Sequence, residues 1–325
     1  MKFILILLFM FSCSKSNENT LNIYSSLDAK ETADYIKKFE ADTGIKVNWV
    51  RMSTGETLAR LMAEKNSPQV SIWFGGTSPE FITATRKGLL EAYKPAVNYE
   101  LDLNQRDKDY HWTGIYFGAI GFATNDKIIK ELGVSAPKSW NDLLKPEFKG
   151  KVSMAYPYTS GTAYTVVSSI LQMMGEKKGW EFIKNLNSQI HHYNKSGSAA
   201  VTQAGIGEIA VGISFSHDIL KKGKGAGYPV TLSFPSEGTG FEVGSMALVK
   251  NGPNNTLGKK FIDYFASAKG QSGFNKYFRV ALNPEITPSE GMIKRSEVNL
   301  IEFDALKAAN EQARVIEQWK TTVTN

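Results

Sequence analysis

The segment of residues 207–218, GEIAVGISFSHD, constrains the fold more than any other part of the chain. Its centre, residues 209–213, is apolar and rich in β-branched side chains, and turn-forming residues bound it, which predicts a buried strand of an α/β sheet. In such sheets ligands bind beyond the carboxyl ends of the strands, which is where Ser216, His217 and Asp218 fall. The segment therefore predicts both a sheet strand and a binding site at its end.

Extended and helical patterns alternate along the chain, which favours a mostly parallel sheet. The strands expected from this alternation are residues 21–26, 45–52, 70–74, 151–155 and 209–213. Two longer apolar runs, residues 114–123 and 241–249, are expected to cross between two lobes. A chain of 325 residues also favours two domains. We predict a first lobe of residues 21–118 plus 244–325 and a second lobe of residues 119–243.

The chain begins with a short basic start and an apolar run, residues 3–11, that is too short to span a bilayer. The run ends at Cys13, and polar residues follow. This start resembles a bacterial lipoprotein signal peptide, with residues 1–20 as signal peptide and tether. The resemblance implies export to the periplasm and a lipid anchor on Cys13 that holds the protein to the membrane. Cys13 is the only cysteine, so the rest of the chain has no disulfide or thiolate site.

Composition and motifs exclude several classes of function. The net charge is +6, but acidic residues are interspersed and no dense Lys/Arg block occurs, so nucleic acid is not an expected partner. The phosphate-binding pattern Gly-x-x-x-x-Gly-Lys-Ser/Thr is absent, which leaves nucleotide hydrolysis without support. The Gly-x-Ser-x-Gly elbow of serine hydrolases is absent as well. We do not expect an enzyme.

Four loops combine Ser, Thr and Gly between an extended and a helical segment: residues 53–55, 75–78, 159–162 and 195–198. Each can present backbone N–H groups, hydroxyls and the positive end of a helix dipole to an oxyanion. Plain helix capping is the alternative for any single loop. Because two loops fall in each predicted lobe, we expect an oxyanion-binding cleft between the lobes. Arg51, Arg60 and Lys195 are the basic residues that can assist; Lys195 is the best of the three, and a solvated surface lysine is the alternative for it.

A second set of residues offers carboxylate and imidazole groups: His217, Asp218, Glu237 and Glu242. Carboxylates accept hydrogen bonds from neighbouring hydroxyls, as in sugar recognition. A glycosidase acid pair and a metal site are the alternatives for these groups. His191 and His192 are adjacent on an expected strand, so their side chains should point to opposite faces and not share an ion. We therefore predict no metal site and no cofactor.

Residues 140–157, WNDLLKPEFKGKVSMAYP, together with the lipoprotein start and the two-lobe alternation, resemble solute-binding proteins of ABC importers. The branch is the one that contains ferric-iron and phosphonate binders, and the Ser/Thr/Gly loops look most like those of hexose-phosphate binders. The resemblance implies a type II periplasmic-binding-protein fold with two crossing strands as hinge. It also implies a monomer that captures a phosphorylated sugar and delivers it to an ABC permease in the inner membrane. The ligand-binding residues that we predict are Ser25, Ser26, Ser53, Thr54, Gly76, Thr77, Ser160, Gly161, Thr162, Lys195, Ser196, Ser216, His217, Asp218, Glu237 and Glu242.

The chain departs from the true ferric binders at one important place. That family carries an adjacent tyrosine pair after the strand that ends here at residues 214–216, where this chain has no tyrosine. No histidine follows Tyr24 either. Iron uptake through carboxylates and an accessory anion, and binding of a phosphonate, are the two alternatives to a sugar phosphate.

Overall fold

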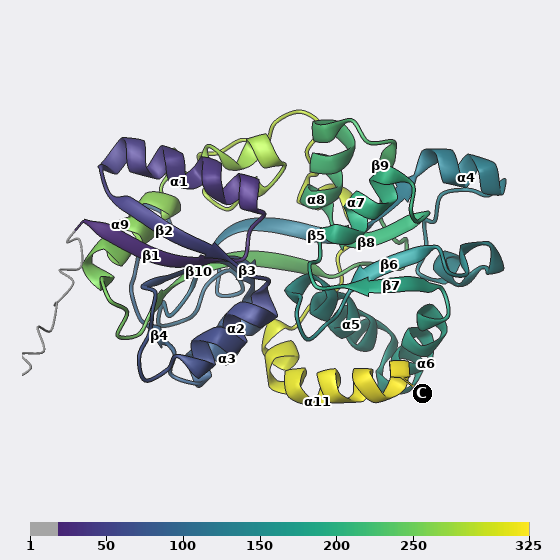
Figure 1. The fold of residues 1–325 in the computed structure, drawn as a ribbon, viewed down its shortest axis with the longest axis horizontal. Helices are drawn as coiled ribbons and strands as arrows, with labels where there is room; N and C mark the ends of the chain where they lie inside the picture. Colours follow the sequence, from purple (N-terminus) through teal and green to yellow (C-terminus); the bar gives the residue numbers. More distant parts are fainter. Residues whose placement is uncertain (1–18, 325) are drawn as a thin grey trace, which may run out of the picture.

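The structure, a computed structural model, describes residues 19–324. Cys13 and the predicted signal peptide lie outside the described residues. Two α/β lobes lie side by side along the longest axis of the molecule, and a continuous sheet runs through both (Figure 1). The order of its main strands is β2-β1-β3-β10-β5-β8-β6-β7, while β4 pairs with β10 and both β9 and β11 pair with β5.

The strands have the following bounds: β1 Thr20–Ser25, β2 Lys46–Arg51, β3 Ile72–Thr77, β4 Leu90–Glu91, β5 Thr113–Asn125, β6 Val152–Ala155, β7 Ile190–Asn194, β8 Val211–Phe215, β9 Val230–Ser233, β10 Phe241–Val249 and β11 Val280–Ala281. The helices are α1 Ala29–Thr43, α2 Thr54–Ala63, α3 Ser78–Arg86, α4 Asp126–Leu132, α5 Gly161–Met174, α6 Glu176–Asn187, α7 Ala199–Ile206, α8 Ser216–Leu220, α9 Asn255–Ala266, α10 Ala268–Gln271 and α11 Ala305–Thr324. Within residues 19–324 no helix has the length and apolar character needed to cross a membrane.

Local signals explain where the helices of the first lobe begin and end. Asp28 caps α1 by accepting a hydrogen bond of 3.0 Å from the backbone N–H of Lys30. Gly44 ends the helix in the left-handed region, with φ of 72°. The start of α2 is fixed by Glu56, whose carboxylate accepts the backbone N–H of Ser53 at 3.0 Å. These caps place the residues that precede each helix at the carboxyl edge of the sheet.

The two crossing strands expected from the sequence are present as β5 and β10, which pair with each other in antiparallel register. The first part of β5 pairs with β11 at Tyr116 and Phe117, and its second part pairs with β8 from Ile120 onward. The strand therefore passes from one lobe to the other between Phe117 and Ile120. A register shift in β10 falls at Gly244, beside this passage. The exact lobe boundaries at residues 118 and 244 stay predictions.

Each lobe has its own apolar core. In the first lobe, Phe39, Phe74 and Phe261 pack on one side of the sheet, and the stacked rings of Trp73 and Phe81 lie on the other. In the second lobe, a separate cluster surrounds the fully buried side chains Trp140, Phe148 and Tyr164. Two independent cores joined by two strands allow the lobes to move as rigid bodies.

The C-terminal helix α11 contacts both lobes, so the lobe assignment made on the sequence stays a prediction. We placed residues 244–325 in the first lobe, but the apolar face of α11 packs into the core of the second, below α5 and α6 in Figure 1. Trp319 is 3% exposed and contacts Tyr193 with ring centroids 5.1 Å apart. The helix also contacts α3 of the first lobe: Thr83 Oγ1 donates to Gln312 Oε1 at 3.3 Å, Gln312 Nε2 donates to Glu80 Oε1 at 3.2 Å, and Arg86 donates to Asn310. The apolar stripe of α11 thus covers the core of the second lobe while its polar side chains contact α3, a placement that sequence periodicity does not reveal.

Truncation of Trp319 tests this packing. Trp319→Ala should lower the free energy of unfolding by about 3–5 kcal/mol, because it opens a cavity inside a packed aromatic cluster. Leu306→Ala on the same helix is the matched control, since Leu306 is 53% exposed, and it should cost less than about 1 kcal/mol. Urea unfolding of both variants measures the difference; equal effects would contradict the packing of α11 on the second lobe.

Candidate functional site

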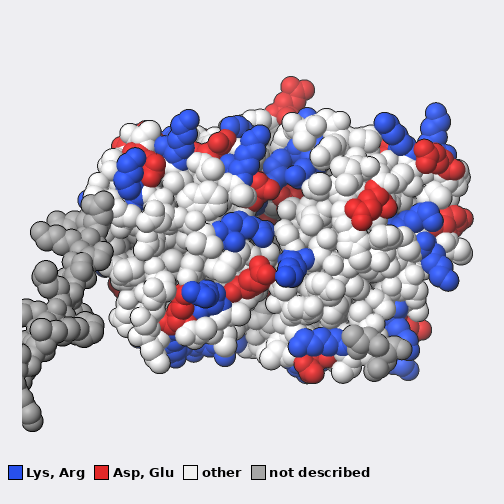
Figure 2. Space-filling view, viewed as in Figure 1, with Lys and Arg blue, Asp and Glu red and all other residues white. Residues whose placement is uncertain are grey.

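A small polar pocket of about 40 Å³ lies where the two lobes meet. Figure 2 shows a hollow between the lobes beside α1 and α8, with basic and acidic side chains close together around it. The loops that reach the pocket follow β1 and β2 in the first lobe and β6, β7 and β8 in the second. Its lining consists of Ser26, Asp28, Arg51, Ser53, Thr54, Ser160, Thr162, Ser196, Gly197, Ser198, Asp218 and Arg279. The site therefore forms at the carboxyl ends of the strands, as the sequence predicted.

Hydroxyl groups from both lobes converge on one side of this pocket. Arg51 connects them, because its Nη1 donates to Ser53 Oγ at 3.2 Å and its Nη2 donates to Ser196 Oγ at 3.0 Å across the lobe boundary. Ser160 caps α5, and Thr162 stands in its first turn. A Cβ on Gly197 would meet Thr162 Oγ1, so only glycine allows the two second-lobe loops to approach this closely. The result is a cluster of neutral donors around one guanidinium.

The lobes touch each other directly at this edge. The backbone N–H of Gly55 donates to the carbonyl of Thr159 at 3.0 Å. A Cβ on Gly55 would lie 2.7 Å from the carbonyl oxygen of Tyr158. A Cβ on Gly161 would likewise collide with the hydroxyl oxygen of Thr77 in the first lobe. Glycine at these positions lets the backbones meet, so the structure represents a closed arrangement of the lobes.

A buried charged cluster forms the other side of the pocket. Arg279 Nε donates to Glu31 Oε2 at 2.7 Å, and its guanidinium lies 4.3 Å from the centre of the Tyr116 ring. Lys221 Nζ pairs with Glu31 and, at 3.1 Å, with Asp218 Oδ1. Glu31 and Arg279 come from the first lobe, and Asp218 and Lys221 from the second. The cluster therefore joins the lobes by ion pairs that are largely removed from water.

Burial and the mutual charges set the protonation of this cluster. Burial, helped by the Arg279 guanidinium, holds the pKa of His217 well below its usual range, so the ring is neutral. Burial raises the pKa of Glu242 well above its usual range despite the nearby Arg279. Asp218 behaves in the opposite way, because Lys221 and its other charged neighbours outweigh burial and lower the pKa of its carboxyl group. The surroundings therefore favour the charged form of Asp218 and the neutral forms of His217 and Glu242.

His217 faces away from the pocket and holds Arg279. Its Nε2 accepts a hydrogen bond of 2.8 Å from Arg279 Nη1, which places the ring proton on Nδ1. The Nδ1 atom faces the backbone of β5, where a Cβ on Gly118 would lie 2.5 Å from it. The ring also stacks on Phe215, with centroids 5.6 Å apart. His217 thus positions the guanidinium that lines the pocket.

The structure brings seven of the predicted residues into the pocket lining: Ser26, Ser53, Thr54, Ser160, Thr162, Ser196 and Asp218. Gly76, Thr77 and Gly161 lie directly behind them, in contact with Thr54 or with one another. Ser25 is buried behind the loop, with its Oγ 2.7 Å from Thr32 Oγ1. Ser216 Oγ accepts the backbone N–H of Ala119 at 3.3 Å and is also buried.

Lys195, Glu237 and Glu242, like His217, do not line the pocket. The Lys195 side chain is exposed, and only its backbone carbonyl is used, by the Thr159 hydroxyl at 2.9 Å. Glu237 fastens a loop of the second lobe, since its carboxylate accepts the Ser139 hydroxyl at 2.6 Å and the Trp140 backbone N–H at 3.1 Å. Glu242 is buried beside His217, with Oε1 3.5 Å from the ring Nε2.

The basic residue that lines the pocket is not the one that the sequence analysis favoured. Lys195 was the preferred partner for an anion, yet Arg51 is the one that lines the pocket, while Arg60 pairs with Glu64 on the surface. Arg279 was missed altogether, because it precedes the two-residue strand β11 and has no recognisable motif around it. Glu31 was not predicted as a site residue either; it stands in the first turn of α1, and its carboxylate binds Arg279 and Lys221.

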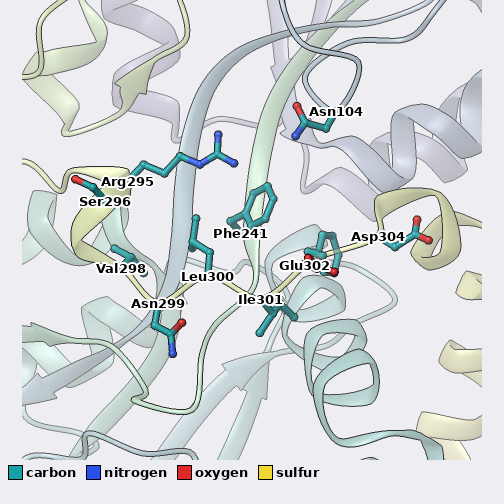
Figure 3. A pocket seen from close by; sticks show the side chains of 11 residues that line it. Asn104, Phe241, Arg295, Ser296, Val298, Asn299, Leu300, Ile301, Glu302 and Asp304 are labelled. Carbon is teal, nitrogen blue, oxygen red and sulfur yellow. The ribbon is translucent and has the colours of Figure 1, made fainter.

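A larger and more open hollow of about 1150 Å³ lies beside the crossing strands (Figure 3). Its lining is Asn104, Phe241, Arg295, Ser296, Val298, Asn299, Leu300, Ile301, Glu302, Phe303 and Asp304. Arg295 extends over the rings of Phe117 and Phe241, 5.7 Å from each centre. None of the predicted ligand residues reaches this hollow, and its charged groups do not converge on a point.

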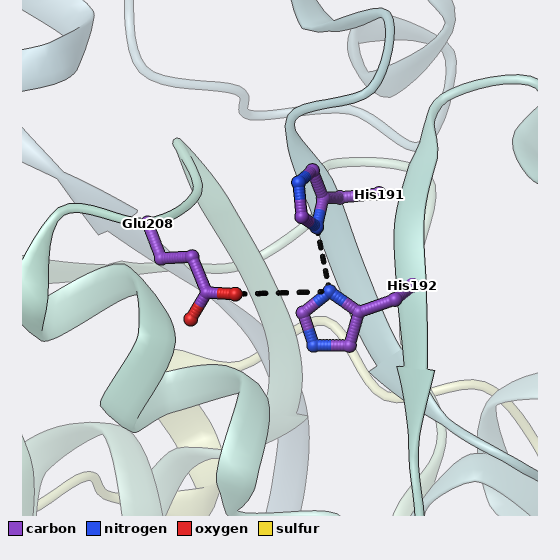
Figure 4. Close-up of side chains that lie close together, drawn as sticks. All are labelled: His191, His192 and Glu208. Carbon is purple, nitrogen blue, oxygen red and sulfur yellow. Dashed lines mark hydrogen bonds and ion pairs between the residues drawn. The ribbon is translucent and has the colours of Figure 1, made fainter.

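The prediction for His191 and His192 was wrong. We expected their side chains on opposite faces of the strand, but their Nδ1 atoms lie 2.6 Å apart (Figure 4). The cause is an irregularity in β7: Val152 of β6 pairs with Ile190, and Ser153 pairs with His192, so His191 is an extra residue in the ladder. Such a bulge breaks the alternation of side chains that the sequence argument assumed.

Two α/β lobes joined by crossing strands, with a polar cleft at the carboxyl edge, define a type II periplasmic-binding-protein fold. Residues 77–308 match the model of one such family, and the chain belongs to the bacterial extracellular solute-binding proteins. It is 33% identical over 319 residues to an uncharacterized protein of Haemophilus influenzae, covering 95% of this chain and 92% of the relative.

Solved structures confirm the predicted fold class. The periplasmic binding protein AfuA from Actinobacillus pleuropneumoniae, solved with exogenous fructose-6-phosphate bound, matches with a TM-score of 0.90 at 33% identity. The match covers 94% of this chain and 98% of that chain. The ferric binding protein from Campylobacter jejuni matches with a TM-score of 0.78 at 22% identity, over 93% and 99% of the two chains. The second likeness supports the shared fold alone.

Neutralising Glu31 tests the buried ion cluster. Glu31→Gln should lower the free energy of unfolding by about 3–5 kcal/mol, because it leaves Arg279 and Lys221 buried with one carboxylate fewer. Glu40→Gln on the same helix is the matched control, since its pairing with Lys46 is exposed to solvent, and it should cost less than about 1 kcal/mol. Chemical denaturation at neutral pH provides the measurement, and a loss for Glu31→Gln no larger than the control would contradict the cluster.

Proposed function

We propose that this protein binds a small phosphorylated solute, most plainly a hexose phosphate, between its lobes and delivers it to an ABC permease in the inner membrane. The observation that carries the proposal is the lining of the interlobe pocket, where hydroxyls and two guanidinium groups stand beside two carboxylates. The hydroxyls and guanidinium groups suit a phosphate group, and the carboxylates suit the hydroxyls of a sugar. A ligand that carries both groups fits both sides of the pocket at once.

The hydroxyl side supports binding of the phosphate group. Ser160 and Thr162 begin α5, and Ser53 and Thr54 begin α2, so helix N-termini from both lobes face the same small space. Backbone N–H groups and the helix dipole favour an anion there. Arg51 adds the fork of donors that matches phosphate oxygens. Hydrogen bonds to a charged oxygen contribute roughly 1.5–3 kcal/mol each, so a few such donors produce strong binding.

The charged side supports recognition of hydroxyl groups. Asp28 and Asp218 accept hydrogen bonds only, and both line the pocket. Arg279 is held by Glu31 through Nε and by His217 through Nη1, while Nη2 has no hydrogen-bond partner among the described residues. In the closed arrangement Glu31 and His217 thus orient the guanidinium, which keeps one nitrogen for a ligand. This arrangement supports a ligand rich in hydroxyls in preference to phosphate alone.

The size of the pocket implies that the lobes must open to admit such a ligand. A volume of about 40 Å³ is far below the ~300–1,000 Å³ of pockets that hold small organic ligands. The paired strands β5 and β10 are the connection about which a hinge motion can occur. Binding then replaces part of the direct contact between lobes with contacts through the ligand.

The relatives support the same class of ligand. AfuA, solved with fructose-6-phosphate, is one of them, and a putative 2-aminoethylphosphonate-binding periplasmic protein of Salmonella typhimurium is another, at 24% identity. A Fe(3+)-binding periplasmic protein of Serratia marcescens is also related, at 22% identity. The lining of this pocket contains no tyrosine and no histidine, which weighs against iron. We also propose that the protein works in the periplasm, held to the membrane by lipidated Cys13.

Removal of two hydroxyls tests the phosphate side. Ser160→Ala with Thr162→Ala should weaken binding of glucose 6-phosphate and fructose 6-phosphate by at least about 100-fold, the loss of two bonds to a charged group. Calorimetric titration of refolded, ligand-free protein gives the affinities. Thr321→Ala with Thr322→Ala, on the C-terminal helix, removes two hydroxyls outside the pocket and should leave them unchanged. Tight binding of ferric citrate in place of both sugars would overturn the proposal.

Removal of one negative charge tests the sugar side. Asp218→Asn should weaken hexose phosphate binding by about tenfold or more, whereas the affinity for inorganic phosphate should stay within a few-fold. Glu237→Gln is the matched control, because Glu237 lies outside the pocket, and it should bind both ligands like the unaltered protein. Competition titration with phosphate separates the two effects. An equal loss of affinity for phosphate and for sugar phosphate would show that Asp218 does not bind the sugar hydroxyls.

A further inference from the structure

We propose that His191, His192 and Glu208 form a binding site for a divalent transition-metal ion on the surface of the second lobe. The nearest ring nitrogens and the carboxylate oxygen of these residues all lie within 4.8 Å of one another. Figure 4 shows the three side chains directed toward a common point, the two histidines from β7 and Glu208 from the far side. None of the three lines the interlobe pocket, so this site is separate from the one proposed for the solute.

The bulge in β7 is what creates the histidine pair. A regular strand would place adjacent side chains on opposite faces, about 180° apart. Here His191 is inserted between the paired residues Ile190 and His192, and both imidazoles turn to the same side. Bulges of this kind re-aim side chains at particular positions of a sheet. Because β7 is the last strand in the sheet order, the pair stands at an edge with access to solvent.

Glu208 is held opposite the pair by the end of α7. Gly207 ends that helix in the left-handed region, with φ of 84°. Its backbone N–H donates to Ala204 and that of Glu208 donates to Gln203, at 3.2 and 2.9 Å, which is the hydrogen-bond pattern of a Schellman motif. The backbone of Glu208 is therefore fixed, and its Oε1 lies 3.9 Å from His192 Nδ1.

The distances suit a metal ion after a small adjustment. Ligand atoms about 2.0–2.1 Å from a tetrahedral ion lie about 3.3 Å apart. The two Nδ1 atoms are 2.6 Å apart, and the His192–Glu208 separation is 3.9 Å, so the rings must part slightly and the carboxylate must approach. Two imidazoles and one carboxylate are borderline ligands that favour Zn²⁺, Ni²⁺ or Cu²⁺ over Mg²⁺ or Ca²⁺. Water completes the coordination.

The environment of His192 makes the proposal more specific. Its Nε2 contacts the side-chain amide nitrogen of Gln203, whose oxygen accepts from Asn194 at 2.8 Å. In this arrangement the amide donates to Nε2, so the metal-free ring carries its proton on Nδ1. A metal ion bound to Nδ1 leaves no room for a proton there, so the neutral ring must carry its proton on Nε2. That N–H group then needs a hydrogen-bond acceptor beside it. The Gln203 amide must therefore rotate to present its oxygen to Nε2 when an ion binds, whereas a carboxylate at this position can accept the proton without rotation.

A second group of possible ligands, Asp107, Asp109 and His111, provides a contrast. The Asp107 Oδ1 atom already accepts the backbone N–H groups of Asp109 and His111, each at 3.1 Å, and lies 2.9 Å from His111 Nδ1. That carboxylate and ring are thus occupied in stabilising a turn. His111→Ala is therefore the matched control for loss of one histidine.

The test is calorimetric titration of tag-free mature protein carrying Cys13→Ser with ZnCl₂, in a non-chelating buffer without sugar phosphate. One ion should bind per chain, and MgCl₂ should give no heat. His191→Ala and His192→Ala should each weaken zinc binding by at least about tenfold, whereas His111→Ala should not change it. Unchanged binding in His191→Ala, or loss of binding in His111→Ala, would overturn the proposal.

Gln203→Glu separates a built site from incidental chelation by exposed histidines. The carboxylate can accept the Nε2 proton of His192, so zinc affinity should rise by about tenfold, within the usual range for such outer partners. Unchanged or lower affinity in Gln203→Glu would contradict the proposed coordination through Nδ1. Thermal unfolding without metal checks that each variant is folded. Titration of the same variants with glucose 6-phosphate reports on the cleft, so failure of one proposal is distinguishable from failure of the other.

Discussion

The buried ion pairs of Glu31, Arg279, Asp218 and Lys221 are the constraint on which the closed arrangement of this molecule depends. Transfer of a charged group from water into the protein costs several kcal/mol unless the group is paired. Each group of this cluster therefore holds its partner in place. Glu31 and Arg279 belong to the first lobe, and Lys221 and Asp218 to the second. The pairing is complete only when the lobes meet. Separation of the lobes would break these pairs and return their charges to water.

The hinge and the site are linked through the same strands. His217 packs between the backbone of β5 at Gly118 and the guanidinium of Arg279, which follows the helix-rich segment leading to β11. Strand β11 pairs with β5 at Phe117, and β5 enters the second lobe by Ile120. Arg279 directly precedes β11, so its backbone lies beside the place where β5 passes between the lobes. A rotation of the lobes about this point must move His217 relative to Arg279. The guanidinium therefore has its full set of partners only in the closed state.

Much of the fold was predictable because its signals are local. The caps of α1 and α2, the crossing strands and the Ser/Thr/Gly loops all follow from residues within a few positions of one another. The remaining features depend on distant contacts. Arg279 meets His217 across 62 residues, and Trp319 finds its aromatic partners in the second lobe. The pairing of His191 and His192 depended on one inserted residue in the ladder, which no periodicity could show.

The mixture of charges in the cleft bears on which anion it prefers. A bare phosphate in the pocket gains the donors of Arg51 and the helix starts but also meets the carboxylates of Asp28 and Asp218, which repel it. A phosphate ester of a sugar places hydroxyls beside those carboxylates, where they donate hydrogen bonds and convert repulsion into attraction. Selectivity of this kind arises from a penalty against the wrong ligand as well as from contacts to the right one. If the pocket binds an oxyanion as proposed, its acidic residues would thus disfavour inorganic phosphate relative to a phosphate ester of a sugar.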